Sequence, residues 1–161
     1  MTLGSLVLRL SRRLHGCRRR WYRWRLVLVQ STAQASVQIG RGVTFNVPVR
    51  GSGQGVIRIG DGTCLGQAAG FRLGSGEVSL YTANAQAEIV IGRNGFLNNN
   101  VSIGAVEKVV VGDDCLIGAC VSIADCDFHG IDPKTRRQSQ GPTRPVILGQ
   151  NVWLGTGVAG L

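Results

Sequence analysis

The sequence has only two histidines, His15 and His129, and its five cysteines include no CxxC pair. An odd number of cysteines without metal-binding spacing favours free thiols in a reducing cytosol. No N-terminal stretch has the basic-then-apolar order of a secretory signal peptide. We therefore expect a cytoplasmic protein.

Acidic residues are missing from residues 1–30, which contain eight arginines. Residues 31–161 hold the other ten bases against nine acids, so the net charge of +9 belongs to the first segment and not to the rest of the chain. This distribution argues against a fold that binds nucleic acid over its whole surface.

An amphipathic helix is predicted within residues 1–30. Its apolar residues recur alternately four and three positions apart, and every arginine falls off their stripe. The stripe consists of Leu3, Val7, Leu10, Leu14, Cys17, Trp21, Trp24 and Leu28. The longest apolar run, residues 26–29, is too short to span a bilayer.

Three partners of this helix stay open. A basic helix with tryptophans and Tyr22 has the composition expected at an anionic membrane interface, which would place the protein at the inner face of the membrane. Alternatively, the stripe packs on the rest of the protein or on a sister subunit. The third alternative, nucleic acid bound by the arginines, is the least favoured.

Glycine is abundant, with 24 residues, and many glycines follow an aliphatic residue at a step of six. These aliphatic anchors are Ile39, Ile59, Leu65, Ile91, Ile103, Val111, Ile117, Leu148 and Leu154. Two positions before each anchor stands another small or apolar residue, as expected for a short strand whose alternate side chains point inward. Glycine after the anchor suits a tight corner, because it has no side chain to restrict the change of direction.

A six-residue step is neither a helical nor a hairpin period. We interpret each hexad as one short strand and one corner, and stacked hexads as the turns of a parallel β-helix. The predicted chain is mainly β, with the helix of residues 1–30 followed by a β-helix domain over residues 31–161. Residues 66–88 fit the period poorly, since Phe71 and Leu73 compete as anchors, and are predicted to form a bulged coil or a loop.

The glycines do not indicate a nucleotide-binding loop or a calcium-binding repeat. The segments "GRGVTF" and "GSGQG" lack the full spacing of a dinucleotide-binding loop followed by a helical pattern. The regular aspartates of calcium-binding nonapeptide repeats are absent.

Three segments, "VVVGDDCLIGACVSI", "DFHGIDPKTRR" and "RPVILGQNVWLG", carry a resemblance. In this order they resemble the hexapeptide-repeat O-acetyltransferases, particularly the maltose and galactoside acetyltransferases and the polysaccharide O-acetyltransferases. The resemblance covers roughly residues 37–161. It implies a left-handed parallel β-helix, a homotrimer, acetyl-CoA as donor without a metal, and active sites between adjacent subunits. The implied acceptor is a sugar or a glycan intermediate of polysaccharide biosynthesis.

The period is interrupted at residues 124–146, which we interpret as a catalytic loop. In the resembling enzymes, the histidine of this loop is the catalytic base, and in this sequence it is His129. A sugar hydroxyl is a poor nucleophile at neutral pH, so a base must remove its proton during attack on the thioester. An imidazole, with an unperturbed pKa of about 6.5, accepts a proton near pH 7 and releases it afterwards.

The resemblance implies roles for several further residues. Asn98 matches an asparagine that contacts the acceptor hydroxyl, with Asn100 as the alternative if the register slips. Trp153 matches a tryptophan that lines the active site, where its flat face would pack on the donor or the sugar. Independently of the resemblance, Asp125 or Asp127 would orient the imidazole as acids do in catalytic triads, or both acids are simply solvated in the loop.

Other residues near the loop are open to two interpretations. An acid that the galactoside enzyme uses to bind its acceptor falls at Val106, and Glu107 is only adjacent. Cys126, close to His129 in sequence, suggests an acyl-enzyme, whereas the resembling enzymes transfer the acetyl group directly. Arg136, Arg137 and Arg144 would meet donor phosphates or a charged glycan, or simply lie on the loop surface.

The resembling enzymes continue beyond "NVWLG" with further coils, so we expect this chain to be truncated at its C-terminal end. A catalytically incomplete scaffold, or a membrane-associated oligomeric binding protein, is therefore the alternative function. A zinc-dependent β-helix hydratase is disfavoured, because it needs three histidine ligands per site.

Overall fold

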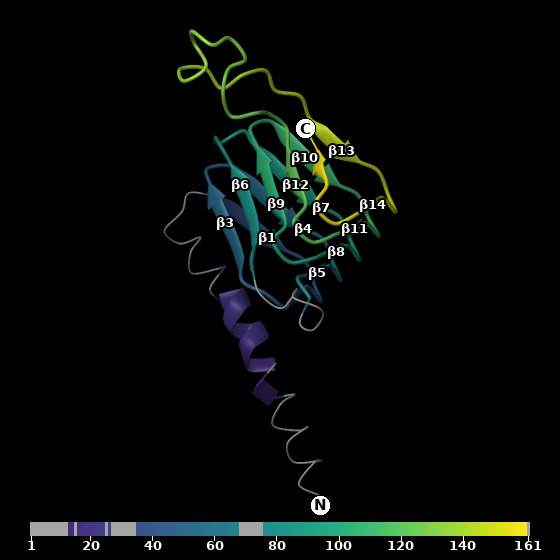
Figure 1. Ribbon diagram of the computed structural model, residues 1–161. Helices are drawn as coiled ribbons and strands as arrows, with labels where there is room; N and C mark the ends of the chain where they lie inside the picture. Colours follow the sequence, from purple (N-terminus) through teal and green to yellow (C-terminus); the bar gives the residue numbers. More distant parts are fainter. Residues whose placement is uncertain (1–12, 15, 25, 27–34, 68–75, 161) are drawn as a thin grey trace, which may run out of the picture.

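The computed structural model describes residues 13, 14, 16–24, 26, 35–67 and 76–160, and its strands form three parallel sheets (Figure 1). Sheet A contains β1 (Ser36–Ile39), β4 (Val56–Ile59), β7 (Glu88–Ile91), β10 (Lys108–Val111) and β13 (Val146–Leu148). Sheet B contains β2 (Thr44–Phe45), β5 (Cys64–Leu65), β8 (Phe96–Leu97), β11 (Leu116–Ile117) and β14 (Trp153–Leu154). Sheet C contains β3 (Val49–Gly53), β6 (Val78–Thr82), β9 (Ser102–Ala105), β12 (Ser122–Ala124) and β15 (Ala159–Gly160).

Consecutive strands visit the three sheets in turn, and each strand pairs in parallel with the strand one coil later. The chain is thus wound into a three-sided parallel β-helix, and the predicted fold class, the left-handed parallel β-helix, is confirmed.

The predicted anchors form the core of the coils. The anchors Ile59, Ile91 and Val111 lie at matching register positions of sheet A and are buried, each at most 3% exposed. Cys115 is buried as well and its thiol lies 3.1 Å from the carbonyl oxygen of Gly149, so its interpretation as a core residue is confirmed. Stacked aliphatic columns of this kind supply the hydrophobic stabilisation of the fold.

Gly60 and Gly92, which follow the anchors Ile59 and Ile91, have a different role from the predicted one, whereas Gly66, after Leu65, has a φ of 80° and forms a corner as predicted. A Cβ on Gly60 or Gly92 would lie 2.5–2.6 Å from backbone atoms of the next coil, so these glycines permit close stacking. The corner itself lies two residues further on, where Gly62, Asn94 and Asp114 have a φ between 54° and 71°. Asparagine and aspartate tolerate this left-handed conformation better than other side chains do.

Two insertions interrupt the coils. In an uninterrupted coil the paired residues are 20 positions apart, as for Val37 with Ile57 and for Ile89 with Val109. The pairs Ile57 with Ile89 and Val109 with Val146 are farther apart in the sequence, so each of these two coils contains an insertion. The first insertion falls in the predicted irregular stretch 66–88, of which residues 68–75, including Phe71 and Leu73, lie outside the described residues. The second is the predicted loop, which leaves the coil after β12 and returns at β13.

The N-terminal helix, residues 13, 14, 16–24 and 26 in the described part, meets the first coil through Leu26. Leu26 is fully buried and, with Val37, would touch a Cβ placed on Gly51; Tyr22 packs against the same core. Figure 1 shows the helix leading away from the strands. No helix in the described part of the chain is long and apolar enough to cross a membrane.

The predicted apolar stripe of the helix does not make this contact. Its described members, Leu14, Cys17, Trp21 and Trp24, are all exposed. Packing of the stripe on its own chain was therefore a wrong alternative, because a different pair of residues attaches the helix. The stripe residues Leu3, Val7, Leu10 and Leu28, and also His15, lie outside the described residues.

Candidate active site

His129 is exposed near the start of the loop between β12 and β13. Its Nδ1 lies 3.2 Å from the carbonyl oxygen of Gly130, and the Gly130 N–H in turn donates to the carbonyl oxygen of Arg136 at 3.1 Å. On the other side, a Cβ on Gly141 would lie 2.4 Å from the carbonyl oxygen of His129. The histidine is thus held by contacts within the loop, with its ring outside the coil.

The residue before the histidine fixes the loop to the coil. Phe128 has a φ of 58°, an uncommon conformation for a bulky side chain. Its ring covers Gly104 of β9, where a Cβ would lie 2.9 Å from Phe128 Cζ. The ring centroids of Phe128 and Tyr81 are 6.0 Å apart with the planes tilted by 52°, a favourable aromatic arrangement. These contacts place the backbone on which His129 stands.

An open pocket of about 650 Å³ lies between this aromatic pair and the loop. His129 lines it together with Tyr81, Phe128, Arg136 and Arg137. The pocket therefore combines an imidazole, two aromatic rings and two guanidinium groups, which suits a polar ligand that carries a hydroxyl near the histidine.

Asp125, one of the two acids expected to orient His129, makes other contacts. It is 4% exposed, and its carboxylate accepts hydrogen bonds from the backbone N–H groups of Val106, Glu107 and Lys108 at 2.7–2.8 Å. The acid thus joins the base of the loop to the turn after β9. The Val106 position, where the resemblance implies an acid, provides one of these backbone donors.

Cys126 is buried, with 5% of its surface exposed. Burial raises the pKa of its thiol, and the neighbouring carboxylates of Asp125 and Asp127 raise it further, outweighing the hydrogen bond from the Phe128 N–H. A thiol must be ionised to attack a thioester, so these surroundings disfavour the acyl-enzyme alternative.

Trp153 stands on the outer face of sheet B and is 77% exposed. In the register of this sheet it follows Leu116, which is 51% exposed, and Phe96. These three side chains occupy the position before the inward anchor in successive coils. They form an apolar ladder on the surface that could have been identified from the alternation of the hexads.

Asn98 lies next to this ladder, two residues after Phe96, and is half-buried. Its side-chain oxygen accepts a 2.7 Å hydrogen bond from the Asn99 N–H, and its amide donates to Gln67 at 3.4 Å. Asn100 is an exposed corner residue with a φ of 59°. Asparagine tolerates this left-handed conformation, so the corner alone explains the residue at this position. Asp127 is exposed in the loop.

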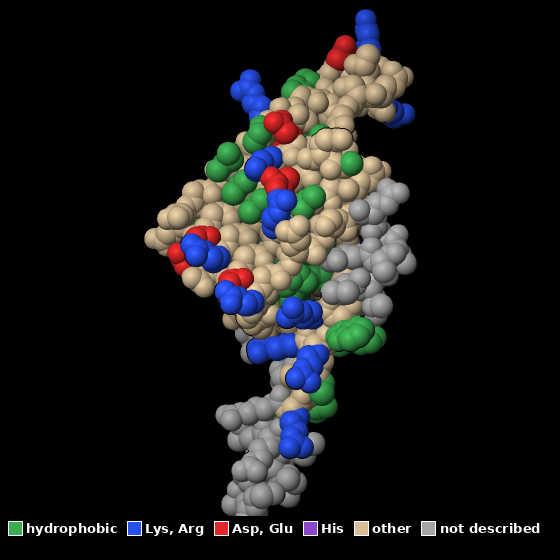
Figure 2. All heavy atoms as spheres, turned by 180° about the vertical axis from the view of Figure 1, so that it is seen from behind, with side chains coloured by type: hydrophobic (Ala, Val, Ile, Leu, Met, Phe, Trp, Pro, Cys, Tyr) green, Lys and Arg blue, Asp and Glu red, His purple; other side chains and the backbone are tan. Residues whose placement is uncertain are grey.

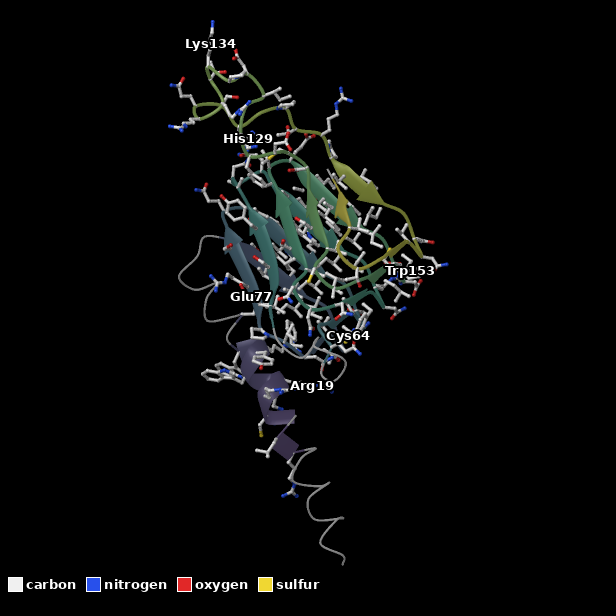
Figure 3. All side chains as sticks on the ribbon, in the orientation of Figure 1. Arg19, Cys64, Glu77, His129, Lys134 and Trp153 are labelled. Atoms are coloured by element: carbon white, nitrogen blue, oxygen red, sulfur yellow. The ribbon has the colours of Figure 1, made fainter. Side chains whose placement is uncertain are left out.

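Asn98, Trp153 and His129 form two groups within one chain. Asn98 and Trp153 belong to sheet B and its edge, whereas His129 follows β12 of sheet C. Figure 3 shows His129 at the base of the loop and Trp153 at a distant edge of the coils. A single chain therefore does not bring the histidine to the tryptophan.

The geometry and the repeat can now be compared with known proteins. The chain is 41% identical over 69 residues to nodulation protein L of Rhizobium meliloti, a match covering 43% of this chain and 37% of that protein. It is 32% identical over 72 residues to galactoside O-acetyltransferase of Escherichia coli, covering 45% of this chain and 35% of the relative. The predicted resemblance to hexapeptide-repeat acetyltransferases is confirmed.

A second nodulation protein L, from Rhizobium leguminosarum, is 38% identical over 69 residues, or 43% of this chain and 36% of the relative. The matched segments thus span little more than a third of the length of these relatives. No protein-family model and no solved structure matches the chain.

Sequence patterns missed Tyr81, Gly104 and Phe128. Gly104 follows the anchor Ile103 and therefore resembled the other glycines of the repeat, although it occupies an outward position within β9 and not a corner. The hexad pattern alone gave no signal that another side chain lies over this part of the strand.

Proposed function

We propose that the protein is an O-acetyltransferase that moves the acetyl group of acetyl-CoA to a hydroxyl of a sugar or of a polysaccharide intermediate, with His129 as the general base. The proposal is supported by the similarity to acetyltransferases and by an exposed imidazole that stands beside a pocket with two aromatic rings. Aromatic faces of this kind pack well on the apolar faces of sugar rings.

The hydrogen bond of His129 suggests which nitrogen acts as the base. With its hydrogen on Nδ1, the ring donates to the carbonyl oxygen of Gly130 at 3.2 Å, and Nε2 keeps a free lone pair. This nitrogen accepts the proton of the acceptor hydroxyl while the oxygen attacks the thioester carbonyl. The loop contacts of Gly130 and Phe128 hold the ring for that step.

Attack gives a tetrahedral intermediate that carries one negative charge on the former carbonyl oxygen. When it collapses, the carbon–sulfur bond breaks, the new ester is released and the imidazolium returns its proton to the departing thiolate. The products are the acetylated acceptor and free CoA, and His129 ends in its starting state.

We place the complete site between two subunits of a homotrimer. His129 of one subunit would face the sheet B surface of its neighbour, where Asn98 would contact the acceptor hydroxyl and Trp153 would pack on the donor or the sugar. Asn100 is the alternative contact for the hydroxyl, and Asp127 would orient the imidazole only if its carboxylate replaced the Gly130 carbonyl oxygen as the acceptor of the Nδ1–H. The separation of His129 from Trp153 within one chain is what favours a shared site.

One observation carries this proposal most directly: His129 stands in a loop that Phe128 fixes to the coil and that internal contacts hold, and it lines the open pocket. A histidine held in this way is accessible to a hydroxyl and is not part of the core.

The test is acceptor-dependent release of thiol from acetyl-CoA, measured with neutral and acidic sugars for the wild type, His129→Gln and Lys134→Gln. Lys134 is an exposed residue at the tip of the same loop (Figure 3) and serves as the matched control. We expect a fall of about 10²–10⁴-fold in kcat for His129→Gln and no change for Lys134→Gln. Wild-type activity in His129→Gln would refute the role of the base, and no thiol release by the wild type with any sugar would favour a catalytically incomplete scaffold.

A further inference from the structure

The N-terminal helix has two opposite sides with different surroundings. Tyr22 and Leu26, one turn apart, attach it to the first coil. Leu14, Cys17, Trp21 and Trp24 recur at steps of three and four and therefore lie along another side. With 100° per residue, this second side points away from the contact with the coil.

The side that points away from the coil is apolar and exposed. Leu14, Trp21 and Trp24 are 67%, 61% and 64% exposed. Two tryptophans at this level of exposure are uncommon on a surface that meets only water, because each ring leaves a large apolar area unburied.

Basic side chains flank this apolar side. At the helical step, Arg13 and Arg20 fall on one flank and Arg18 on the other, whereas Arg19 and Arg23 fall toward the coil-facing side. The segment contains no acid. Figure 2 shows basic side chains gathered along the helix beside hydrophobic ones.

The arginines of the helix differ from the bases of the coil in their partners. On sheet A, Glu88 pairs with Arg58 and with Lys108, the latter at 2.8 Å. Among the residues that the structure describes, the helix arginines take part in no such ion pair. Their charge remains available for an anionic partner.

We propose that this side of the helix, formed by Leu14, Trp21 and Trp24 and flanked by Arg13, Arg18 and Arg20, binds the surface of an anionic lipid bilayer. Tryptophan rings lie at the depth of the lipid headgroups, and guanidinium groups bind the lipid phosphates around them. A second copy of the chain fits less well, because it would bring an equally basic helix against this one.

Attachment through this helix leaves the loop accessible. Figure 1 shows the helix and the loop that follows β12 at opposite ends of the molecule. Leu26 is buried where the helix meets the first coil, beside Gly51. The bilayer proposal therefore holds whether or not the pocket at His129 is catalytic.

The experiment uses the full chain and co-sedimentation with vesicles of phosphatidylcholine and phosphatidylglycerol at a 3:1 ratio, or of phosphatidylcholine alone. We expect binding to the anionic vesicles and a loss of about tenfold in partitioning for Trp21→Ser with Trp24→Ser. Arg18→Gln with Arg20→Gln should weaken binding clearly more than the matched pair Arg19→Gln with Arg23→Gln, which removes the same charge from the other side.

All six substituted side chains are exposed, so thermal unfolding should show an intact β-helix in every variant. Absence of wild-type binding to anionic vesicles would overturn the proposal, as would equal binding by the double tryptophan variant. A change of oligomeric state in that variant without any vesicle binding would assign the surface to a second copy. Binding to RNA but not to vesicles would assign it to nucleic acid.

Discussion

The ring of Phe128 lies directly on Gly104: a Cβ on that glycine would be 2.9 Å from Phe128 Cζ. Gly104 belongs to β9, and Phe128 precedes His129 in a loop that begins one coil later. Because Gly104 has no side chain, the Phe128 ring can lie on β9, and this contact positions the backbone of the neighbouring His129.

Gly104→Ala should reduce activity without unfolding the chain. The added methyl group points outward and forces the Phe128 ring to shift, which displaces His129 and lowers kcat by about tenfold while the KM for acetyl-CoA stays similar. Gly149→Ala is the matched control, because a Cβ there meets nothing within 4 Å. Equal kcat values for the two variants would show that Phe128 does not position the histidine.

Asp125→Asn should destabilise the protein at the base of the loop. An amide cannot accept the three backbone hydrogen bonds that the carboxylate accepts, and leaving one buried N–H without a partner costs about 1–3 kcal/mol in the free energy of unfolding. Asp127→Asn, at an exposed position of the same loop, should change that free energy by less than about 0.5 kcal/mol. Urea unfolding measures both, and similar values for the two variants would contradict the structural role of Asp125.

Cys126 should react slowly with iodoacetamide in the folded protein at pH 7.5. Its burial and its raised pKa both lower the concentration of accessible thiolate, whereas Cys120 is exposed. Mass spectrometry after short labelling should find Cys120 modified well before Cys126, and similar modification of both in guanidinium chloride. Cys126→Ala should retain acetyl transfer, and its inactivity would revive the acyl-enzyme.

The pair of Arg93 and Asp113 should make stability depend on pH in the acid range. Hydrogen bonds from Arg93 lower the pKa of the Asp113 carboxyl below its ordinary value, so the pair stabilises the folded state above the unfolded pKa of about 3.9. This contribution is lost as the pH falls through the lower pKa of the folded state. The Tm of Asp113→Asn should therefore lie below that of the wild type at pH 7 and approach it at pH 2, and a constant difference would contradict the assignment.

The repeat made most of the fold predictable. The anchors and the residues two positions before them are the inward side chains of the sheets, because alternation along a short strand is fixed by backbone geometry. The role of Gly60 and Gly92 was predicted wrongly, since their close contacts are with backbone atoms of the next coil, far away in the sequence. The sequence around one glycine does not show which residues of the next coil will lie against it.

The site was only partly predictable. His129 was identified by its loop and by the resemblance, but the contacts of Phe128 with Gly104 and Tyr81 depend on how the loop folds back onto sheet C. The role of Asp125 depends in the same way on a backbone turn in the preceding coil. Long-range contacts of this kind leave no periodic signal in one sequence.

The most direct test of a shared active site is complementation between two inactive variants. His129→Gln and the double variant Asn98→Ala with Trp153→Ala each remove one half of the proposed site. Co-expressed with different tags and purified as mixed trimers, they should recover about a third of the wild-type rate of acetyl transfer, because in every mixed trimer one of the three interfaces pairs an intact His129 with an intact sheet B surface. A mixed trimer no more active than the separate variants would contradict a site built from His129 of one subunit and the sheet B surface of its neighbour.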